Sequence, residues 1–412
     1  MRNNKLKISS SYVLTALSLA IIVAAVFFVS CYRNVEKRYD YIGEGRGAAS
    51  LDSLFRTVFP DDGPGGIIEV RSADSVVFRA AYGLANLETK EAITDSTVFN
   101  LAFSSKFFSA TAVMKLVEDG VLSLDDSLAK FFPEFQGDFF KKITIRNVLS
   151  HTSGLPDIRP VNPDEWDSYM PGSATVFSNV NDYILYGMED EHMKVFARLI
   201  SLAWEPGSHY DRTDPSYMLL APIIERATGV KFENWMCENL FIPSGMNEAF
   251  YYTPGEPLPP MAHAYRHPEG VVPKNTFVSK DGLWEEHDYG ETKFFLTKAN
   301  RGLFTTLRSF NAFLQAYYKG ELISKESMAL MATPLNETGV PYSFYGFGTA
   351  IRCEPGTPSK NYHLSNNGAF SVIDGCWPEE NIYYSILSNR NDWDMREVMT
   401  EVDDIIRKNY FK

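Results

Sequence analysis

Cysteine is scarce in this chain, which excludes a fold held together by a disulfide framework. The four cysteines are Cys31, Cys237, Cys353 and Cys376, and no two of them form a Cys-x-x-Cys pair. The three that follow residue 31 are an odd and low number for a disulfide-rich secreted domain. Cys353 and Cys376 could pair if they stand on neighbouring strands, and three free, partly buried thiols are an equal alternative.

Motifs for metals and phosphates are also missing. None of the seven histidines stands in a His-Glu-x-x-His pattern, and there is no glycine-rich phosphate loop. His263 and His267 are four residues apart, but they follow Pro259-Pro260 in a loop-like stretch with no acid at ligand spacing. We therefore expect structural histidines, no metal and no cofactor.

Basic charge is in deficit. The chain has 52 acidic and 39 basic residues, a formal net charge of −13. A polyanion would be repelled, so nucleic acid is not an expected partner.

Internal repeats and long tracts of biased composition are absent from the sequence. The hydrophobic content of 45% is enough for one large core or for two subdomains that share a cleft.

The N-terminus, by contrast, has the pattern of a membrane or export segment. Residues 1–7 carry three basic side chains and no acid, and Tyr12–Val29 is an uncharged, largely apolar run. That run is at the lower limit for crossing a bilayer and longer than the usual core of a signal peptide. Three interpretations remain open: an uncleaved anchor, a cleaved signal, and a lipoprotein signal in which Cys31 is lipidated.

The remainder of the chain reads as a tether followed by one large domain. We expect a membrane anchor or signal at residues 1–31, a tether at 32–50 and a domain at 51–412, facing the periplasm or the cell exterior. Strand-like runs lie near both ends of the domain, with mostly helical sequence between them. This order predicts an α+β or α/β fold: an antiparallel sheet built from both chain ends and flanked by helices, beside a mostly helical lobe. The cleft between the two parts is the expected site. The strand-like runs are Ile67–Arg71, Val76–Tyr82, Phe347–Cys353, Ala369–Trp377 and Ile382–Ser388.

Several stretches together resemble the serine β-lactamase and penicillin-binding-protein family, in its class C β-lactamase-related branch. They are Gly83-Leu84-Ala85-Asn86, the helix with Lys106 that is expected to begin near Ala102 and to end at Asp119-Gly120, the stretch Leu116–Asp126, His151-Thr152-Ser153-Gly154, Pro206-Gly207, Gly302–Thr306, Tyr345–Gly348 and Leu387-Ser388-Asn389. The resemblance covers most of residues 51–410. It implies the family's fold and, where the catalytic residues are kept, a serine hydrolase of β-lactamase, D-Ala-D-Ala carboxypeptidase or esterase type.

The first catalytic motif of that family is Ser-x-x-Lys, in which the lysine takes the proton of the nucleophilic serine. Its lysine matches Lys106, but the nucleophile position holds Phe103. Ser104 and Ser105 stand two and one residues before Lys106, so neither shares its helix face. Ser127-Leu128-Ala129-Lys130 has the right spacing, but it falls where the family has a surface helix, and we interpret it as a chance match.

The other two motifs are altered as well. In the family's Tyr-x-Asn motif, the tyrosine position holds Arg212 and the asparagine position holds Asp214; Tyr210 is two residues out of register. Arginine stays protonated, so it cannot act as the base. The third motif, Lys-Thr-Gly or His-x-Gly, matches His363-Leu364-Ser365, with serine replacing the glycine that lets substrate approach the strand.

Two hypotheses follow from these replacements. In the first, the protein is an inactive member of the family whose cleft binds a small-molecule or peptide anion through Lys106, Arg212, Asp214 and His363. The simpler version of this hypothesis is an inactive protein whose cleft binds no ligand. In the second, the protein is an active hydrolase with rewired chemistry that uses Ser104, Ser105 or a water activated by Lys106 and Asp214. We expect His151 to be a scaffold residue rather than a base.

Overall fold

The computed structural model describes residues 41–156, 196–197, 199–251, 260–268, 276–286, 298–368 and 370–411. The predicted anchor or signal at residues 1–31 lies outside these residues, as does most of the predicted tether. Among the helices within the described ranges, none combines the length and apolar character needed to cross a bilayer.

The centre of the fold is an antiparallel sheet, as predicted. Both chain ends build it, because β2 pairs along its whole length with β17. The order is β1 (Ile42–Gly43), β3 (Ser75–Tyr82), β2 (Gly66–Ser72), β17 (Ile382–Ser388), β16 (Ser371–Trp377), β15 (Lys360–Asn366), β14 (Ala350–Arg352), β13 (Ser343–Tyr345) and β12 (Asn336–Glu337). The sheet has nine strands, and four of them, β1, β12, β13 and β15, fall outside the five strand-like runs identified in the sequence.

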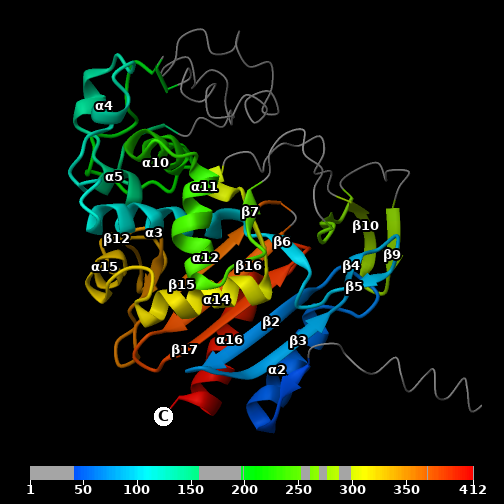
Figure 1. The fold of residues 1–412 in the computed structure, drawn as a ribbon. Coiled ribbons are helices and arrows are strands. Elements are labelled where there is room, and N and C mark those ends of the chain that lie inside the picture. The colour runs from blue at the N-terminus through cyan, green and yellow to red at the C-terminus, as the bar shows by residue number, and fades with distance from the viewer. Residues whose placement is uncertain are drawn as a thin grey trace, which may run out of the picture. The chain divides into compact units, whose positions relative to one another are not determined.

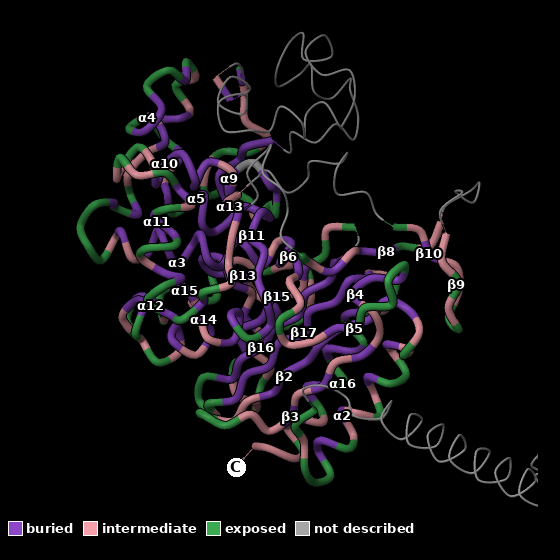
Figure 2. Tube along the Cα trace, turned by 45° about the vertical axis from the view of Figure 1, so that its right-hand side comes forward, coloured by how far each residue is buried: buried purple, intermediate pink, exposed green. Residues whose placement is uncertain are grey.

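The two strands at the middle of the sheet explain why the chain has continuous apolar runs near its C-terminus. Every residue of β16 and of β17 is buried, and Figure 2 shows this band as a buried stripe. Strands covered on both faces need apolar side chains on both faces, so their sequence does not alternate. The sheet therefore separates two cores, one on each face.

Helices α2 (Gly45–Val58) and α16 (Met395–Tyr410) pack together on one face of the sheet (Figure 1). Asp394 caps α16 by accepting hydrogen bonds from the backbone N–H groups of Arg396 and Glu397. Helix α2 buries Leu51 and Phe55. The predicted start of the domain at residue 51 falls inside α2, so the structure places residues 42–50 with the domain, in β1 and the first turns of this helix.

The opposite face carries the helical part that positions the site. A single 3₁₀ turn, η1 (Ala102–Ser104), leads into α3 (Ser105–Glu118), the helix that contains Lys106. Ala102 has a φ of +46°, a left-handed conformation that separates η1 from β6. The other helical elements are α4 (Leu128–Phe131), η2 (Asp138–Lys141), α5 (Ile145–Leu149), α9 (Pro215–Met218), α10 (Leu220–Thr228), α11 (Phe232–Met236), η4 (Cys237–Phe241), α12 (Ile242–Ser244), α13 (Lys298–Arg301), α14 (Leu307–Lys319) and α15 (Lys325–Met331).

Three smaller sheets complete the described structure: β8-β10-β9, β6-β11-β7 and β4-β5. Their strands are β4 (Leu84–Asn86), β5 (Glu91–Ala92), β6 (Val98–Asn100), β7 (Phe250–Tyr251), β8 (Tyr265–Arg266), β9 (Thr276–Ser279), β10 (Gly282–Glu286) and β11 (Leu303–Thr306). Cys237, Cys353 and Cys376 are all free thiols, so the structure does not contain the alternative disulfide.

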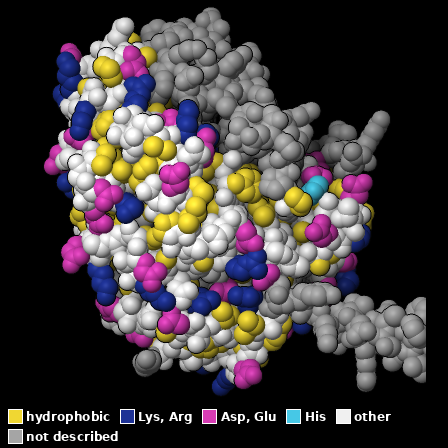
Figure 3. Space-filling view, viewed as in Figure 1, with side chains coloured by type: hydrophobic (Ala, Val, Ile, Leu, Met, Phe, Trp, Pro, Cys, Tyr) yellow, Lys and Arg dark blue, Asp and Glu magenta, His cyan; other side chains and the backbone are white. Residues whose placement is uncertain are grey.

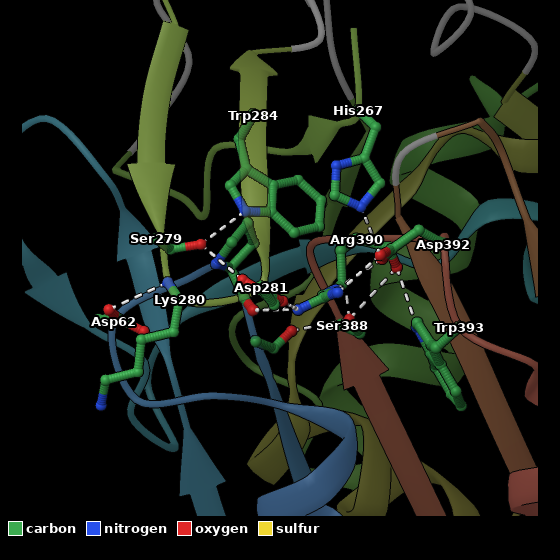
Figure 4. A network of polar contacts seen from close by, with 12 residues as sticks. Asp62, His267, Ser279, Lys280, Asp281, Trp284, Ser388, Arg390, Asp392 and Trp393 are labelled. Atoms are coloured by element: carbon green, nitrogen blue, oxygen red, sulfur yellow. Dashed lines mark hydrogen bonds and ion pairs between the residues drawn. The ribbon is translucent and has the colours of Figure 1, made fainter.

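The buried residue Arg390, which follows β17, connects the β8-β10-β9 sheet to the end of that strand through ion pairs. Figure 4 shows Arg390 between Asp281 of the β9–β10 turn and Asp392, under the ring of Trp284. His267 also stacks on that indole, with ring centroids 4.0 Å apart, and its Nε2 lies 2.8 Å from Asp392. His263 lies 2.6 Å from Glu286. Both histidines thus have structural partners, and the described residues contain no cluster of metal ligands.

Lys360 joins the sheet to α16 from inside the second core. Its ammonium lies 2.6 and 2.7 Å from the two carboxylate oxygens of Asp403 and 2.8 Å from the hydroxyl of Tyr384. The rings of Trp377 and Tyr384 each lie 5.0 Å from the nitrogen, a cation–π arrangement. Burial lowers the pKa of Lys360, and Asp403 opposes that shift.

We predict that Asp403→Asn destabilises the protein by about 3–5 kcal/mol, because it leaves the Lys360 ammonium buried without its counter-ion. Urea denaturation of the full chain measures this. Asp404→Asn is the matched control: Asp404 is exposed and its ion pair with Arg407 is long, 3.7 Å, so a change within about 0.5 kcal/mol is expected. Equal losses in the two variants would contradict the role assigned to Asp403.

Candidate functional site

Four elements converge on one pocket at the start of α3. Phe103 comes from η1, Lys106 from the first turn of α3, and Asp214 from the residue before α9. The free edge of β15 forms the opposite wall, since β14 pairs with β15 only as far as Tyr362. The pocket has a volume of about 240 Å³ and is lined by Phe103, Lys106, Arg212, Asp214, Leu364, Ser365 and Asn366.

The buried carboxylate of Asp214 is shared by two cations. Lys106 Nζ donates to Oδ1 at 3.3 Å, and the Arg301 guanidinium donates to Oδ2. All three side chains are buried, with Lys106 2% and Asp214 3% exposed. Because a buried charge needs a partner, Asp214 and the two cations depend on one another for their positions.

The charges around Lys106 make its amine unusually easy to deprotonate. Burial lowers the pKa of Lys106 to about 7; Asp214 opposes the shift, and the positive charges of Arg212 and Arg301 add to it. Arg301 already offsets the charge of Asp214, so the carboxylate is only partly available to the lysine. Near neutral pH the pocket therefore holds both the protonated and the neutral amine.

Phe103 occupies the nucleophile position as a wall of this cationic cluster. Lys106 Nζ lies 5.0 Å and the Arg301 guanidinium carbon 4.4 Å from the centroid of its ring. Both distances suit cation–π attraction. The phenyl ring thus replaces the hydroxyl at this position by an apolar surface that faces two positive charges.

The serines beside Phe103 do not contact Lys106. Ser104 Oγ lies 2.9 Å from Ser365 Oγ, and Ser105 donates to the carbonyl of Ala102 at 2.7 Å. No hydrogen bond within the described residues joins a serine hydroxyl to Lys106. Ser365, which stands at the family's glycine position, therefore uses its hydroxyl to tie β15 to η1.

A second pocket of about 170 Å³ adjoins the first and shares Arg212 and Leu364 with it. Three phenol rings, those of Tyr210, Tyr345 and Tyr362, line it, and Arg396 and His363 also contribute. Arg212 is exposed at the junction, with its guanidinium carbon 6.0 Å from the centroid of Tyr345. The exposed guanidinium is thus accessible to a ligand from either pocket.

His363 lines the second pocket and is absent from the lining of the first. Its Nδ1 lies 2.7 Å from Asp374, the residue opposite it on β16, and its Nε2 donates to the carbonyl of Gly348 at 3.0 Å. Both ring nitrogens therefore have partners within the protein. The structure brings Lys106, Arg212 and Asp214 together and leaves His363 beside them with a structural bonding pattern.

Two other sequence candidates lie outside these pockets. Lys130 is bonded to Asp126 at the surface, in keeping with a chance Ser-x-x-Lys match. His151 is 1% exposed and packs on Tyr217, with ring centroids 4.7 Å apart. Burial lowers the pKa of His151 well below its usual value, so the ring is neutral and acts as packing.

Sequence reasoning missed Arg301, the second cation on Asp214. One signal was present in the sequence. Arg301 immediately precedes Gly302–Thr306, a stretch that resembles the family. Because Arg301 and Asp214 are far apart in the sequence, the sequence did not identify them as partners.

Fold and site together define a protein of the serine β-lactamase and penicillin-binding-protein class. The family model described as Beta-lactamase matches residues 54–406. The chain belongs to this family.

Its relatives include penicillin-binding protein 4* of Bacillus subtilis, which is 27% identical over 324 residues, 78% of this chain and 66% of that protein. A D-aminopeptidase of Brucella anthropi is 28% identical over 203 residues, 49% of this chain and 35% of the relative. The chain thus spans less than two thirds of either relative. Among solved structures, an octameric penicillin-binding protein homologue from Pyrococcus abyssi matches with a TM-score of 0.68 at 22% identity, over 88% of this chain and 79% of that one.

We predict that the Lys106 amine becomes reactive to an acylating reagent with a half-point near pH 7. Peptide mass spectrometry after brief acylation at graded pH measures it, with Lys130 in the same digest as an internal reference. In Arg212→Gln the half-point moves to higher pH, because the positive charge that lowers the pKa of Lys106 is gone. An unchanged half-point would contradict the electrostatic coupling of these two residues.

Proposed function

We propose that the protein is a membrane-tethered member of the β-lactamase family that binds an anionic ligand, such as a peptide carboxylate, without turning it over. The observation that carries this proposal is the replacement of the nucleophile by Phe103 in a pocket that remains open and is lined by cations. Its relatives include enzymes such as the D-aminopeptidase. The proposal concerns the function of the corresponding cleft in this chain.

The absence of turnover rests on the chemistry of the pocket lining. A phenyl ring cannot attack a carbonyl, and the Arg212 guanidinium at the tyrosine position cannot accept a proton. Removing a nucleophile leaves only the residual rate that binding and oriented donors supply. Ser104 and Ser105 bond to other groups, which weighs against the rewired hydrolase.

Anion binding follows from the charge balance. Two guanidinium groups and one carboxylate leave the site positive before Lys106 is counted, and Arg212 is exposed to receive a ligand. Elsewhere, charges of both signs are interspersed over the face of the molecule shown in Figure 3. The local excess of positive charge is what would select a carboxylate over a neutral ligand.

The membrane tether rests on the sequence alone. The basic leader and the apolar run Tyr12–Val29 support an anchor or an export signal. An export signal, or an anchor with the domain on the outer side, would place the family domain outside the cytoplasm. One relative is a D-aminopeptidase, so peptides that contain D-amino acids are the anionic ligands we propose.

We predict saturable binding of D-Ala-D-Ala peptides in isothermal titration. The affinity falls as the pH rises through about 7, because deprotonation of Lys106 removes one positive charge from the site. Arg212→Gln weakens binding about tenfold or more, the loss expected for one charge-assisted hydrogen bond. Arg146→Gln, an exposed arginine paired with Asp125, is the control and leaves binding unchanged. Flat titrations across peptides and muropeptides would refute ligand binding.

We predict no covalent labelling of the folded protein by a fluorescent penicillin or a fluorophosphonate. The reason is that the pocket lacks a hydroxyl activated by Lys106. Labelling seen on a gel and lost in Ser104→Ala or Ser105→Ala would instead establish the rewired hydrolase, and the variant that abolished it would identify the nucleophile.

A further inference from the structure

We propose that Lys106 captures 2-oxo carboxylates covalently and reversibly: its amine condenses with the ligand's carbonyl to form an imine while Arg212 binds the adjacent carboxylate. The proposal rests on the anion-binding pocket proposed above and adds the class of ligand and the bond it forms. The juxtaposition that supports it is an amine, an exposed guanidinium and a carboxylate lining one pocket of about 240 Å³.

The surroundings of the amine favour its nucleophilic, neutral form. Arg301 donates to one oxygen of Asp214, and Lys106 reaches the other at a long 3.3 Å. A third positive charge beside Arg212 and Arg301 would be poorly compensated in a buried site. Desolvation and neighbouring cations are the two conditions that activate lysines for imine formation.

Phe103 completes the conditions for capture. In the family the lysine serves as base to the serine at this position, whereas here a ring lies 5.0 Å from Nζ and offers no proton. The amine is therefore the strongest nucleophile among the side chains that line the pocket. The apolar ring also excludes water from one side of the bond that forms, which slows hydrolysis of the imine.

The condensation balances without an oxidant or a reductant. The nitrogen lone pair forms a C–N bond to the ligand's C2, and the carbonyl oxygen becomes the hydroxyl of a carbinolamine. One amine proton moves to that oxygen to make the hydroxyl, the second amine proton then joins the hydroxyl, which leaves as water, and a C=N bond remains. Asp214, hydrogen-bonded to the amine, is the group positioned to carry those protons. Addition of water reverses the sequence and releases the ligand.

The adjoining pocket indicates which 2-oxo acids fit best. Arg212 belongs to both pockets, and the second is lined by Tyr210, Tyr345 and Tyr362. A ligand whose carboxylate lies on Arg212 can place an aromatic substituent among these rings. We therefore expect phenylpyruvate to be captured in preference to pyruvate.

The test is reductive trapping of the full chain with phenylpyruvate and cyanoborohydride. The expected result is one adduct by intact mass, located at Lys106 by peptide mapping. Lys106→Met abolishes the adduct, and Arg212→Gln lowers the rate of its formation about tenfold. Lys130→Met changes neither the yield of the adduct nor its rate of formation. Phenyllactate, which has the carboxylate but no carbonyl, suppresses trapping by competition; because this control needs no variant, the proposal stays falsifiable if Lys106→Met fails to fold.

The outcomes separate this proposal from the one on which it rests. Adducts spread over exposed lysines, with no loss in Lys106→Met, would overturn covalent capture while leaving carboxylate binding intact. Absence of both trapping and carboxylate binding would overturn both. Their pH dependences also differ: carboxylate binding strengthens as the pH falls below 7, whereas trapping weakens there, because protonation removes the lone pair of Lys106.

Discussion

The Asp214 carboxylate, held between Lys106 and Arg301, is the interaction on which the site depends. A carboxylate that is 3% exposed can remain charged only with cations beside it, and cations this deeply buried need the carboxylate in return. The replacements are therefore not independent. Arg212 and Asp214 bring opposite charges to one motif, and Phe103 lies against both cations that bind Asp214. Asp214 and Phe103 thus contact the same two cations, and Arg212 lines the same pocket.

The antiparallel sheet and its completion by both chain ends were predictable because the signals of the long apolar strands are local, whereas β15 and the short strands β1, β12 and β13 were not identified. Alternating or continuous apolar runs bounded by turns locate strands, and strands near both chain ends imply a sheet that both ends complete. The start of α2 at Gly45 was not predictable in the same way. Residues 42–50 contain three glycines and no apolar run, and the partners that order them, β3 and α16, lie far along the sequence. Packing decides such a boundary, and local preference does not.

The residues of the site also differ in how far local sequence signals could predict them. Matching motifs to the family identified Lys106, Arg212 and Asp214, and the structure places all three around one pocket. The bonding of His363 and of Arg301 depends instead on strand register and on contacts between segments that are far apart in the sequence. His363 stands opposite Asp374 across two strands, so its ring is bonded within the sheet, a pairing that depends on a register the sequence does not reveal. Arg301 arrives from α13, 87 residues away from its partner Asp214.

An arrangement of this kind has a consequence for stability. The two buried cations, Lys106 and Arg301, and the exposed Arg212 repel each other around one carboxylate, and an apolar core of equal volume would hold the same elements together at least as well. The repulsion is relieved when a ligand supplies a second negative charge beside Arg212. A ligand that binds only the folded state stabilises it by RT ln(1 + [L]/Kd), so the positive charge that destabilises the empty pocket is the same charge that makes occupancy favourable. The proposed anion would therefore stabilise the folded protein as well as occupy its pocket.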